Sequence, residues 1–277
     1  MSCATWGALG PAHPSRGPLA FRLHKWFLDC VTDTGEALIV YAATLRWGWL
    51  RLGYSATLTR DRPDRPAVTT TRWGRPESPR RLEGGFSFDD ARLDVCGRWL
   101  GPPVDHGVTL FEGEHGRVHW HCHLPRADVE LQHGGRTWRG RGYVEHLALE
   151  IAPWHLPIRV LRWGRFHAEG RSLVWIQWEG PVPLRLVLAN GTAVAADPVD
   201  DGGFTLHDGR RLEFGPPSVL RSGELGRTVL TRRLLRCLPL PRSIRTLEET
   251  KVLATARLLE GATEHLGTAL HEVVRWR

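Results

Sequence analysis

The sequence predicts an all-β protein, and three observations lead to that prediction. Short runs rich in β-branched and aromatic residues recur at even spacing, and Gly, Asp and Asn turn signals separate them. No segment combines a long 3.6-residue apolar period with helix-capping residues at its ends. A chain of 277 residues is long enough for one large β domain or two smaller ones with a sizeable core.

The first half of the chain contains the most regular series of predicted strands. Asp33-Thr34-Gly35 is a hairpin signal between the first two of them. The strands expected in this half are Trp26–Val31, Ala37–Leu45, Leu50–Thr59, Ala67–Trp73, Phe86–Asp94, Gly107–Glu112, Arg117–Leu124, Arg126–Leu131 and Tyr143–Ile151.

Pro153-Trp154-His155-Leu156-Pro157 is the best candidate for a boundary, and it divides the chain into domains of residues 1–152 and 153–277. The strands expected after it are Ile158–Phe166, Leu173–Trp178, Leu184–Leu188, Ala193–Ala196, Gly203–Leu206, Arg211–Phe214, Thr228–Leu234 and Thr268–Trp276. Leu247–Leu259 is ambiguous, but the flanking glycines favour a hairpin over a helix. Pro239-Leu240-Pro241 is expected to be a crossing segment before that hairpin.

The charge and the cysteines limit the possible partners and compartments. The net charge is +7, but the cations are dispersed among 30 acids and form no basic stripe, which argues against nucleic acid and leaves peripheral contact with an anionic membrane open. Five scattered cysteines without a CxxC fit free thiols, and no signal peptide or transmembrane span is visible. The expected location is therefore the cytoplasm. The oligomeric state is not predicted.

The most informative stretch is His119-Trp120-His121-Cys122-His123, with Tyr143-Val144-Glu145 about twenty residues later. Alternation on a strand puts the three histidines on one face and Trp120 with Cys122 on the other. The second run places Glu145 on the same face as Leu147, Leu149 and Ile151, which is expected to be the inner face. A turn centred on Gly134 would set His123 opposite Glu145. A register slip of one residue would instead send the histidines outward while Glu145 stayed inside.

A carboxyl group that burial keeps neutral is suited to protonating a carbon–carbon double bond. Glu145 is therefore the candidate acid, and faces of Tyr143, Trp163 or Trp120 could stabilise the resulting carbocation. In the favoured register Trp120 points away from Glu145. A zinc site is the alternative, because two of the three histidines could share a metal with Glu145. A purely structural role, in which the side chain only forms hydrogen bonds, is a further alternative for Glu145 and for Asp29.

Several motifs resemble those of the carotenoid 1,2-hydratase (hydroxyneurosporene synthase-like) family. They are Gly142-Tyr143-Val144-Glu145-His146 after a Trp-x-Cys strand, Leu161-Arg162-Trp163-Gly164-Arg165, Leu270-His271-Glu272-Val273-Val274 and the aromatic Trp26-Phe27-Leu28-Asp29. The resemblance extends from about Leu23 to Trp276. The family's acid is an Asp in a Tyr-x-Asp motif, whereas this chain has Glu145 at that position.

The resemblance implies two lipocalin-like (calycin-like) β-barrel or sandwich domains, without metal or organic cofactor, that hold a bulky apolar molecule. It implies hydration or cyclisation of an isoprenoid-like alkene, as in hydratases and tocopherol-cyclase-like enzymes, or pericyclic cyclisation, as in Diels–Alder relatives. The non-enzymatic alternative is a carrier that binds a lipid without changing it. The expected catalytic residues are Glu145, Tyr143, His123 and His121, and the expected substrate-binding residues are Trp120, Trp163, Trp26, Asp29 and His271.

Overall fold

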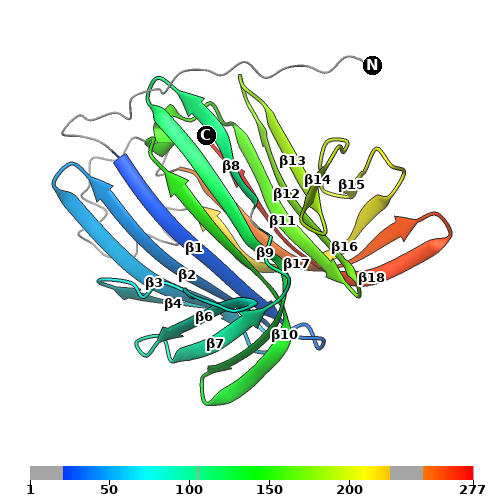
Figure 1. The fold of residues 1–277 in the computed structure, drawn as a ribbon, viewed down its shortest axis with the longest axis horizontal. Coiled ribbons are helices and arrows are strands. Elements are labelled where there is room, and N and C mark those ends of the chain that lie inside the picture. The colour runs from blue at the N-terminus through cyan, green and yellow to red at the C-terminus, as the bar shows by residue number, and fades with distance from the viewer. Residues whose placement is uncertain (1–20, 105, 225–245, 277) are drawn as a thin grey trace.

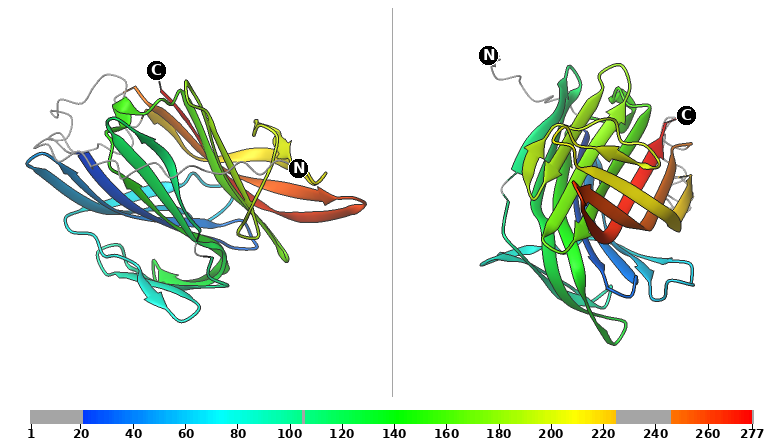
Figure 2. Two further views of the ribbon diagram at one scale, coloured as in Figure 1. Left: turned by 45° about the horizontal axis from the view of Figure 1, so that its top comes forward. Right: turned by 90° about the vertical axis from the view of Figure 1, so that its right-hand side faces the viewer.

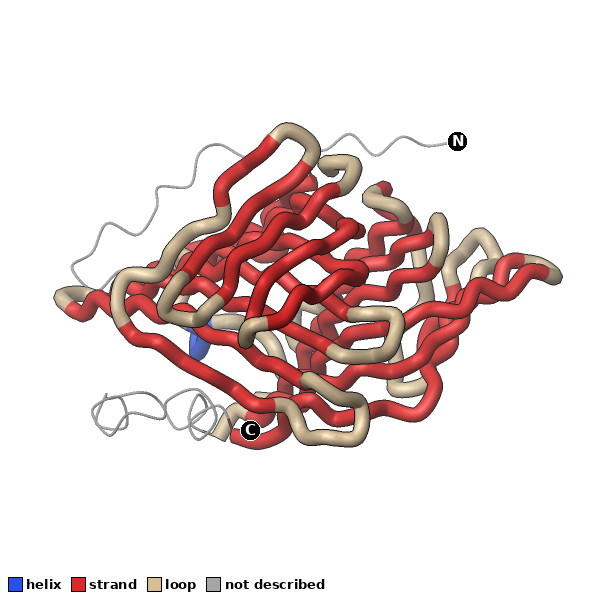
Figure 3. Tube along the Cα trace, turned by 90° about the horizontal axis from the view of Figure 1, so that it is seen from below, coloured by secondary structure: helices blue, strands red, loops and turns tan. Residues whose placement is uncertain are grey.

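The structure is a computed structural model, and it describes residues 21–104, 106–224 and 246–276. In these ranges the chain is nearly all antiparallel strand, with one short 3-10 turn, η1 (Pro153–His155), as Figure 3 shows. The predicted all-β class is therefore confirmed. No helix among the described residues is long and apolar enough to cross a membrane.

The first ten strands form one sheet (Figure 1). Its order is β4-β3-β2-β1-β10-β9-β7-β6-β5, and β8 pairs with the first half of β9. The strands are β1 (Phe21–Val31), β2 (Ala37–Trp47), β3 (Leu50–Arg60), β4 (Val68–Trp73), β5 (Arg80–Leu82), β6 (Gly85–Asp90), β7 (Val95–Leu100), β8 (His106–Gly113), β9 (Gly116–His133) and β10 (Arg136–Leu149).

The other eight strands form a second sheet, in the order β14-β13-β12-β11-β18-β17-β16-β15. They are β11 (Val160–Ala168), β12 (Arg171–Glu179), β13 (Leu184–Ala189), β14 (Thr192–Val194), β15 (Gly203–Thr205), β16 (Arg211–Glu224), β17 (Glu248–Glu260) and β18 (Thr263–Arg275). The chain passes from one sheet to the other between β10 and β11, through η1. The division into two domains at residues 152 and 153 stays a prediction.

Most predicted strands are present, and the differences are local. Phe86–Asp94 was expected as one strand, but β6 ends at Asp90 and a turn leads to β7, which the pattern did not reveal. Two expected strands on either side of Pro125 are the single strand β9, and Leu247–Leu259 is strand, as favoured. Thr228–Leu234 and the Pro239–Pro241 segment lie outside the described residues.

Three clusters of buried apolar residues make up the core. One lies on the face of the first sheet formed by Leu28, Val40 and Trp99, and one belongs to the second sheet around Trp175 and Leu212. The third cluster combines side chains of both sheets, so it joins them. Figure 2 shows the backbones of these two sheets side by side. The candidate site lies in this third cluster, which is called here the inter-sheet core.

Two bulges in β9 determine which side chains of this strand enter the inter-sheet core. Gly142 pairs with Ala127, Val144 pairs with Leu124, and Glu145 pairs with Cys122. The β9 partners advance by one residue more than the β10 residues at each of these two steps, so β9 has one inserted residue on either side of Leu124. One of them is Pro125, which has no N–H to give to a ladder and is typically found at such irregularities. A bulge bends its strand and changes the direction of the side chains that follow it.

Candidate active site between the two sheets

Glu145 is the centre of the candidate site, and three donors surround one of its carboxyl oxygens. Trp120 donates its indole N–H to Oε2 at 2.5 Å, and Tyr143 donates its hydroxyl to the same atom at 2.8 Å. The third donor is the indole N–H of Trp163 at 3.1 Å. Trp163 belongs to β11, whereas the other residues are in β9 and β10, so the site is assembled only when the two sheets pack together.

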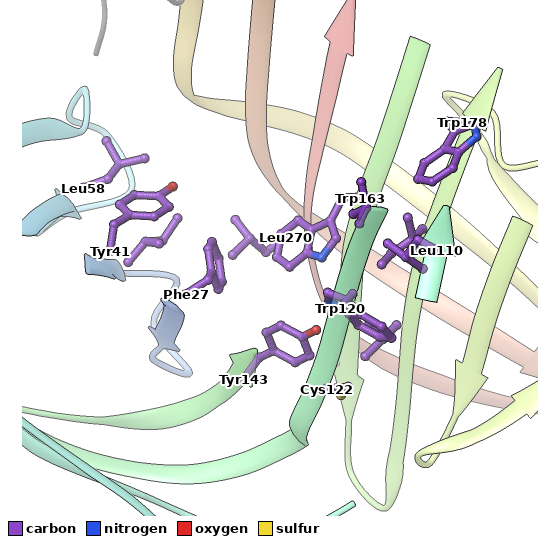
Figure 4. Packing of buried hydrophobic residues seen from close by; sticks show 14 of the residues in the cluster. Phe27, Tyr41, Leu58, Leu110, Trp120, Cys122, Tyr143, Trp163, Trp178 and Leu270 are labelled. Carbon is purple, nitrogen blue, oxygen red and sulfur yellow. The ribbon is translucent and has the colours of Figure 1, made fainter. Parts of the chain in front are cut away.

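The alternation of β10 explains why this carboxyl is inside. Tyr143 and Glu145 share the face that continues to Leu149, and the inter-sheet core covers that face. Tyr143 is fully buried and Glu145 is 9% exposed. The predicted inner position of Glu145 therefore agrees with the structure, and Figure 4 shows Tyr143 and Trp120 of the first sheet extending toward Trp163 of the second.

Burial is the largest influence on the pKa of the Glu145 carboxyl. Removal from water raises the pKa of Glu145, and the hydrogen bonds from Trp120 and Tyr143 lower it in part, as does the positive charge of Lys25. Because burial outweighs these contributions, the neutral acid persists to higher pH than it would in water. The same burial, together with the neighbouring Cys122 and Glu145, raises the pKa of Tyr143 well above its usual value, so its hydroxyl remains a donor.

Aromatic rings surround the acid. Phe27, directly opposite Glu145 in the β1–β10 pairing, contacts Trp163 edge to face with ring centroids 4.7 Å apart. Tyr143 lies 5.8 Å from Trp163 and 6.1 Å from Phe27. These rings offer π faces that attract positive charge, and one already does so, because the Lys251 ammonium lies 5.4 Å from the centroids of both Phe27 and Trp163.

The histidines are not beside Glu145, and the predicted pairing of His123 with Glu145 is wrong. Glu145 pairs with Cys122, and His146 pairs with His121. His123 stacks on Trp26 at 5.1 Å and on His121 at 3.9 Å, on the face of the sheet opposite to the inter-sheet core. The register slip that the sequence left open comes from the turn, because His133 pairs with Arg136 and odd positions of β9 therefore oppose even positions of β10. The two bulges around Leu124 then shift the pairing by two further residues, which sets Cys122 opposite Glu145 and Trp120 next to it on the same face.

Trp26 and His271, which are expected to contact substrate, lie away from Glu145, and Asp29, expected in the same role, is held by another partner. Trp26 packs on the core behind the sheet. Asp29 is fully buried and binds Arg165 of β11 through both oxygens at 3.0 Å, so its carboxylate is occupied by an ion pair across the two sheets. His271 stacks on Phe214 at 4.7 Å, on the far face of the second sheet. Alternation on β1 and β18 explains the positions of Trp26 and His271, because each neighbours a residue that faces the inter-sheet core.

The zinc alternative finds no support in the geometry. Glu145 and the histidine row are on opposite faces of the sheet, and no group of three His, Cys, Asp or Glu side chains in the described ranges could hold a metal ion. The three cysteines in these ranges, Cys30, Cys96 and Cys122, are free thiols.

Sequence reasoning missed a group of charged residues in the inter-sheet core. Lys25 lies on β1 next to Phe27, and Lys251 on β17 is fully buried and pairs with Glu272. Arg221 on β16 pairs with Glu249 at 2.5 Å. One signal was available: Lys25 and Lys251 are the only lysines among 37 basic residues, and both are here.

A groove elsewhere on the molecule has a different character. Its volume is about 850 Å³, and it follows β6, β7, β9 and β10. Its lining includes Arg139 and Arg141, which form surface ion pairs with Glu130 and Asp128. Glu145 is not part of it. The lining is mixed, because apolar side chains such as Phe88 and Leu131 alternate with these ion pairs. Since none of the described residues that line the groove is a buried acid, the inter-sheet site remains the candidate.

Comparison with known proteins relates this architecture to other two-sheet proteins. No protein-family model matches the chain, and no curated protein matches it in sequence. The fold is similar to that of a Nitrosomonas europaea protein provisionally called AttH, with a TM-score of 0.56 and 11% identity over 97% of this chain and 100% of that one. It is also similar to CghA in its structure with Sch210972, with a TM-score of 0.52 and 9% identity over 94% and 89% of the chains.

A third structure, kievitone hydratase from Nectria haematococca, aligns with a TM-score of 0.49 and 11% identity over 91% of this chain and 88% of that one. The TM-scores above 0.5 of the first two structures show a shared fold, and identities this low do not transfer an activity. The protein thus has a lipocalin-like fold, here built from two antiparallel sheets.

Proposed function

We propose that this protein is a hydratase or cyclase that protonates a carbon–carbon double bond of a bulky apolar molecule, with Glu145 as the acid. One observation carries the proposal: Trp120, Tyr143 and Trp163 all donate to Oε2 of a buried carboxyl whose pKa is raised. The motif resemblance to carotenoid 1,2-hydratases supports the same reaction class.

The arrangement suits an acid that must lose its proton. In the neutral form Oε2 accepts the three hydrogen bonds, which leaves Oε1 to carry the proton. When that proton moves to an alkene carbon, the π electrons form the new C–H bond and the carboxyl becomes a carboxylate. Hydrogen bonds to a charged acceptor are stronger than those to a neutral one, so the three donors stabilise the group most after the proton has left.

The carbocation left on the other alkene carbon would lie among Phe27, Tyr143 and Trp163, whose faces attract positive charge. Attack by water, followed by return of a proton to the Glu145 carboxylate, gives net hydration. Attack by a second double bond of the same molecule, followed by loss of a proton, gives cyclisation. Neither His121 nor His123 reaches this space, so the sequence-based role of a histidine in activating water is not part of the proposal.

A pericyclic cyclase is the second candidate, because a neutral Glu145 could also act as a hydrogen-bond donor that polarises a substrate. A carrier without chemistry is the third. Turnover of linear polyenes (lycopene, neurosporene and geranylgeraniol) in D₂O separates them. Acid-initiated chemistry puts one solvent deuteron on carbon in each product. Pericyclic cyclisation puts none there, and a carrier leaves the polyene unchanged.

Glu145→Gln is the decisive variant. It keeps the shape of the side chain but has no acidic proton, and loss of a positioned general acid typically costs about 10²–10⁴-fold in rate. We expect a loss at the upper end, with binding of the polyene retained. Turnover within about tenfold of the unsubstituted protein would contradict the assignment of Glu145 as proton donor.

A further inference from the structure

Both lysines of the chain lie in the inter-sheet core, close to Glu145. Lys25 is two residues before Phe27, and Phe27 is directly opposite Glu145. Two residues of a strand span roughly 7 Å, so one ligand could reach both the Lys25 ammonium and the acid. Lys251 approaches from the other sheet and lies over the rings of Phe27 and Trp163.

Three cations gather around the single ring of Tyr41. The distances to its centroid are 4.9 Å from Nζ of Lys25, 5.8 Å from Nζ of Lys251 and 5.6 Å from Cζ of Arg221. Such a group of like charges is unfavourable unless negative charge balances it.

Two of these cations are balanced by carboxylates. Lys251 pairs with Glu272, and Arg221 pairs with Glu249. Within the described part of the chain, Lys25 forms no ion pair and no hydrogen bond, and its side chain is partly exposed. With Glu145 neutral, the described residues of this group carry three positive charges and two negative ones, and Lys25 shares the charge of Glu272, whose pKa it helps to lower.

The Tyr41 hydroxyl is the second unsatisfied group. Tyr41 is 3% exposed, and its hydroxyl oxygen is buried without a hydrogen-bond partner among the described residues. A buried hydroxyl that lacks a partner is costly, and it usually indicates that a water, an ion or a ligand group completes the site.

We propose that Lys25 and the Tyr41 hydroxyl form an anion-binding subsite beside the acid, and that the substrate is an apolar chain ending in a carboxylate or enolate. The inference rests on the proposed function and adds a substrate class to it. The apolar part lies among the rings around Glu145, and the anionic head lies against Lys25. A plain hydrocarbon would offer neither a counter-charge to the ammonium nor a hydrogen bond to the phenol.

Another role for Lys25 is possible on electrostatic grounds, since its charge also favours the ionised form of Glu145. The two roles differ in what they require of the ligand. A residue that only tunes the acid changes the rate for every substrate equally. A residue that binds the head group discriminates between a ligand with a negative charge and its neutral analogue.

The test compares geranylgeranoic acid with geranylgeraniol, which differ in the head group alone. Binding is followed at neutral pH through quenching of tryptophan fluorescence, in Glu145→Gln as well as in the unsubstituted protein. We expect the acid to bind at least tenfold more tightly than the alcohol in both. Lys25→Met should weaken binding of the acid about tenfold or more while changing binding of the alcohol less than twofold.

Arg22→Met is the matched control, because it removes a cation from the exposed face of the same strand and should change neither affinity. Tyr41→Phe provides a second variant, which removes only the unpartnered hydroxyl and should selectively weaken binding of the acid. Equal affinity for acid and alcohol, or equal losses of both in Lys25→Met, would overturn the subsite. Since no turnover is needed, that result would leave the role of Glu145 as proton donor intact.

Discussion

At Glu145, the atom that accepts the hydrogen bonds determines what the side chain can do. A carboxylate that only formed a structural contact would have no reason to concentrate three donors on one oxygen. Here Oε2 accepts from all three, and none of them reaches Oε1. The group is thus divided into an oxygen that receives charge and an oxygen that can hold a transferable proton.

Removing one of the three donors should raise the pKa of Glu145 further. The donors favour the charged carboxylate, so Trp163→Phe keeps the ring but takes away one stabilising hydrogen bond, worth about 1.5–3 kcal/mol to a charged group. We expect the pH at which the carboxyl band ionises in difference infrared spectra to move upward by about 1–2 units. Turnover should fall as pH rises through that pKa, because the neutral form is the acid.

Trp178→Phe is the control for this prediction. Trp178 is also buried in the inter-sheet core, but its indole N–H donates to the carbonyl of Val182. It should alter packing without changing the ionisation of Glu145. An unchanged band in Trp163→Phe, or equal shifts in both variants, would show that the indole of Trp163 does not stabilise the carboxylate.

At the scale of the element, β9 shows why part of the site was predictable and part was not. Alternation along β10 predicts the inner position of Glu145, because the pattern from Tyr143 to Ile151 is regular there. The identity of its neighbours depends on the pairing of β9 with β10, which two bulges change. Pro125 indicated an irregularity, but nothing in the local sequence specifies how many residues are inserted.

The same limit applies to the charged group around Tyr41. Lys251 and Arg221 are cross-strand partners on the neighbouring strands β17 and β16 of the second sheet, whereas Lys25 is on β1 of the first sheet, far earlier in the sequence. Strand periodicity gives the face of each residue within its own sheet. It says nothing about which face of one sheet packs on the other, so the gathering of these cations required the tertiary structure.

Deleting His123 should be far more damaging than replacing it. His123 is an inserted residue of the bulge between the pairs at Val144 and Glu145. Its removal shifts Trp120 and Cys122 by one position relative to the rest of β9, which turns them to the other face. We expect the deletion variant to lose cooperative unfolding or at least about 3 kcal/mol of stability, since large apolar groups would leave the core.

His123→Ala keeps the length of the strand and removes the ring contacts with Trp26, Phe86 and His121. It should unfold cooperatively in urea, with a loss of about 1 kcal/mol, which is typical of a single substitution. If the deletion were as stable as His123→Ala, the bulge would not determine the register of this hairpin.

At the scale of the whole molecule, polar contacts hold the two sheets in one arrangement. Asp29 of β1 and Arg165 of β11 are both completely buried, and they form two hydrogen bonds to each other. His167 of β11 adds a contact to the first sheet, because its Nε2–H donates to the carbonyl oxygen of Pro125 in β9 at 2.7 Å. Since these groups have specific partners across the interface, they disfavour sliding of one sheet over the other.

Arg165→Met should cost about 3–5 kcal/mol of unfolding free energy in urea titrations, because it leaves the buried Asp29 carboxyl without its partner. Adding Asp29→Leu should recover much of the loss, since an apolar pair of similar volume needs no compensation. Arg139→Met, which breaks the exposed pair with Glu130, serves as the control and should have no measurable effect. If the single and double variants were equally unstable, the loss would come from packing and not from an unpaired charge.

Histidines on both sheets should make the molecule less stable in mild acid. Burial lowers the pKa of His146 and of His271 to about 4, and it lowers the pKa of His167 as well. In the unfolded chain these imidazoles bind protons below about pH 6.5. Between pH 6.5 and 4 the unfolded state therefore binds more protons, and stability falls as the pH falls.

The buried carboxyls of Asp29 and Glu145 act in the opposite direction, because their raised pKa lets the folded state hold protons that the unfolded state has released. Burial also lowers the pKa of His106, so four histidines against these two carboxyls give a net decline toward acid. His271→Phe should reduce the slope of unfolding free energy against pH between 6.5 and 4 by up to about 1.4 kcal/mol per pH unit, the contribution of one proton. Phe214→Leu removes the ring stacked on His271 but no titrating group, so it should lower stability equally across this range. A slope that His271→Phe leaves unchanged would mean that this imidazole binds its proton equally in the folded and unfolded states.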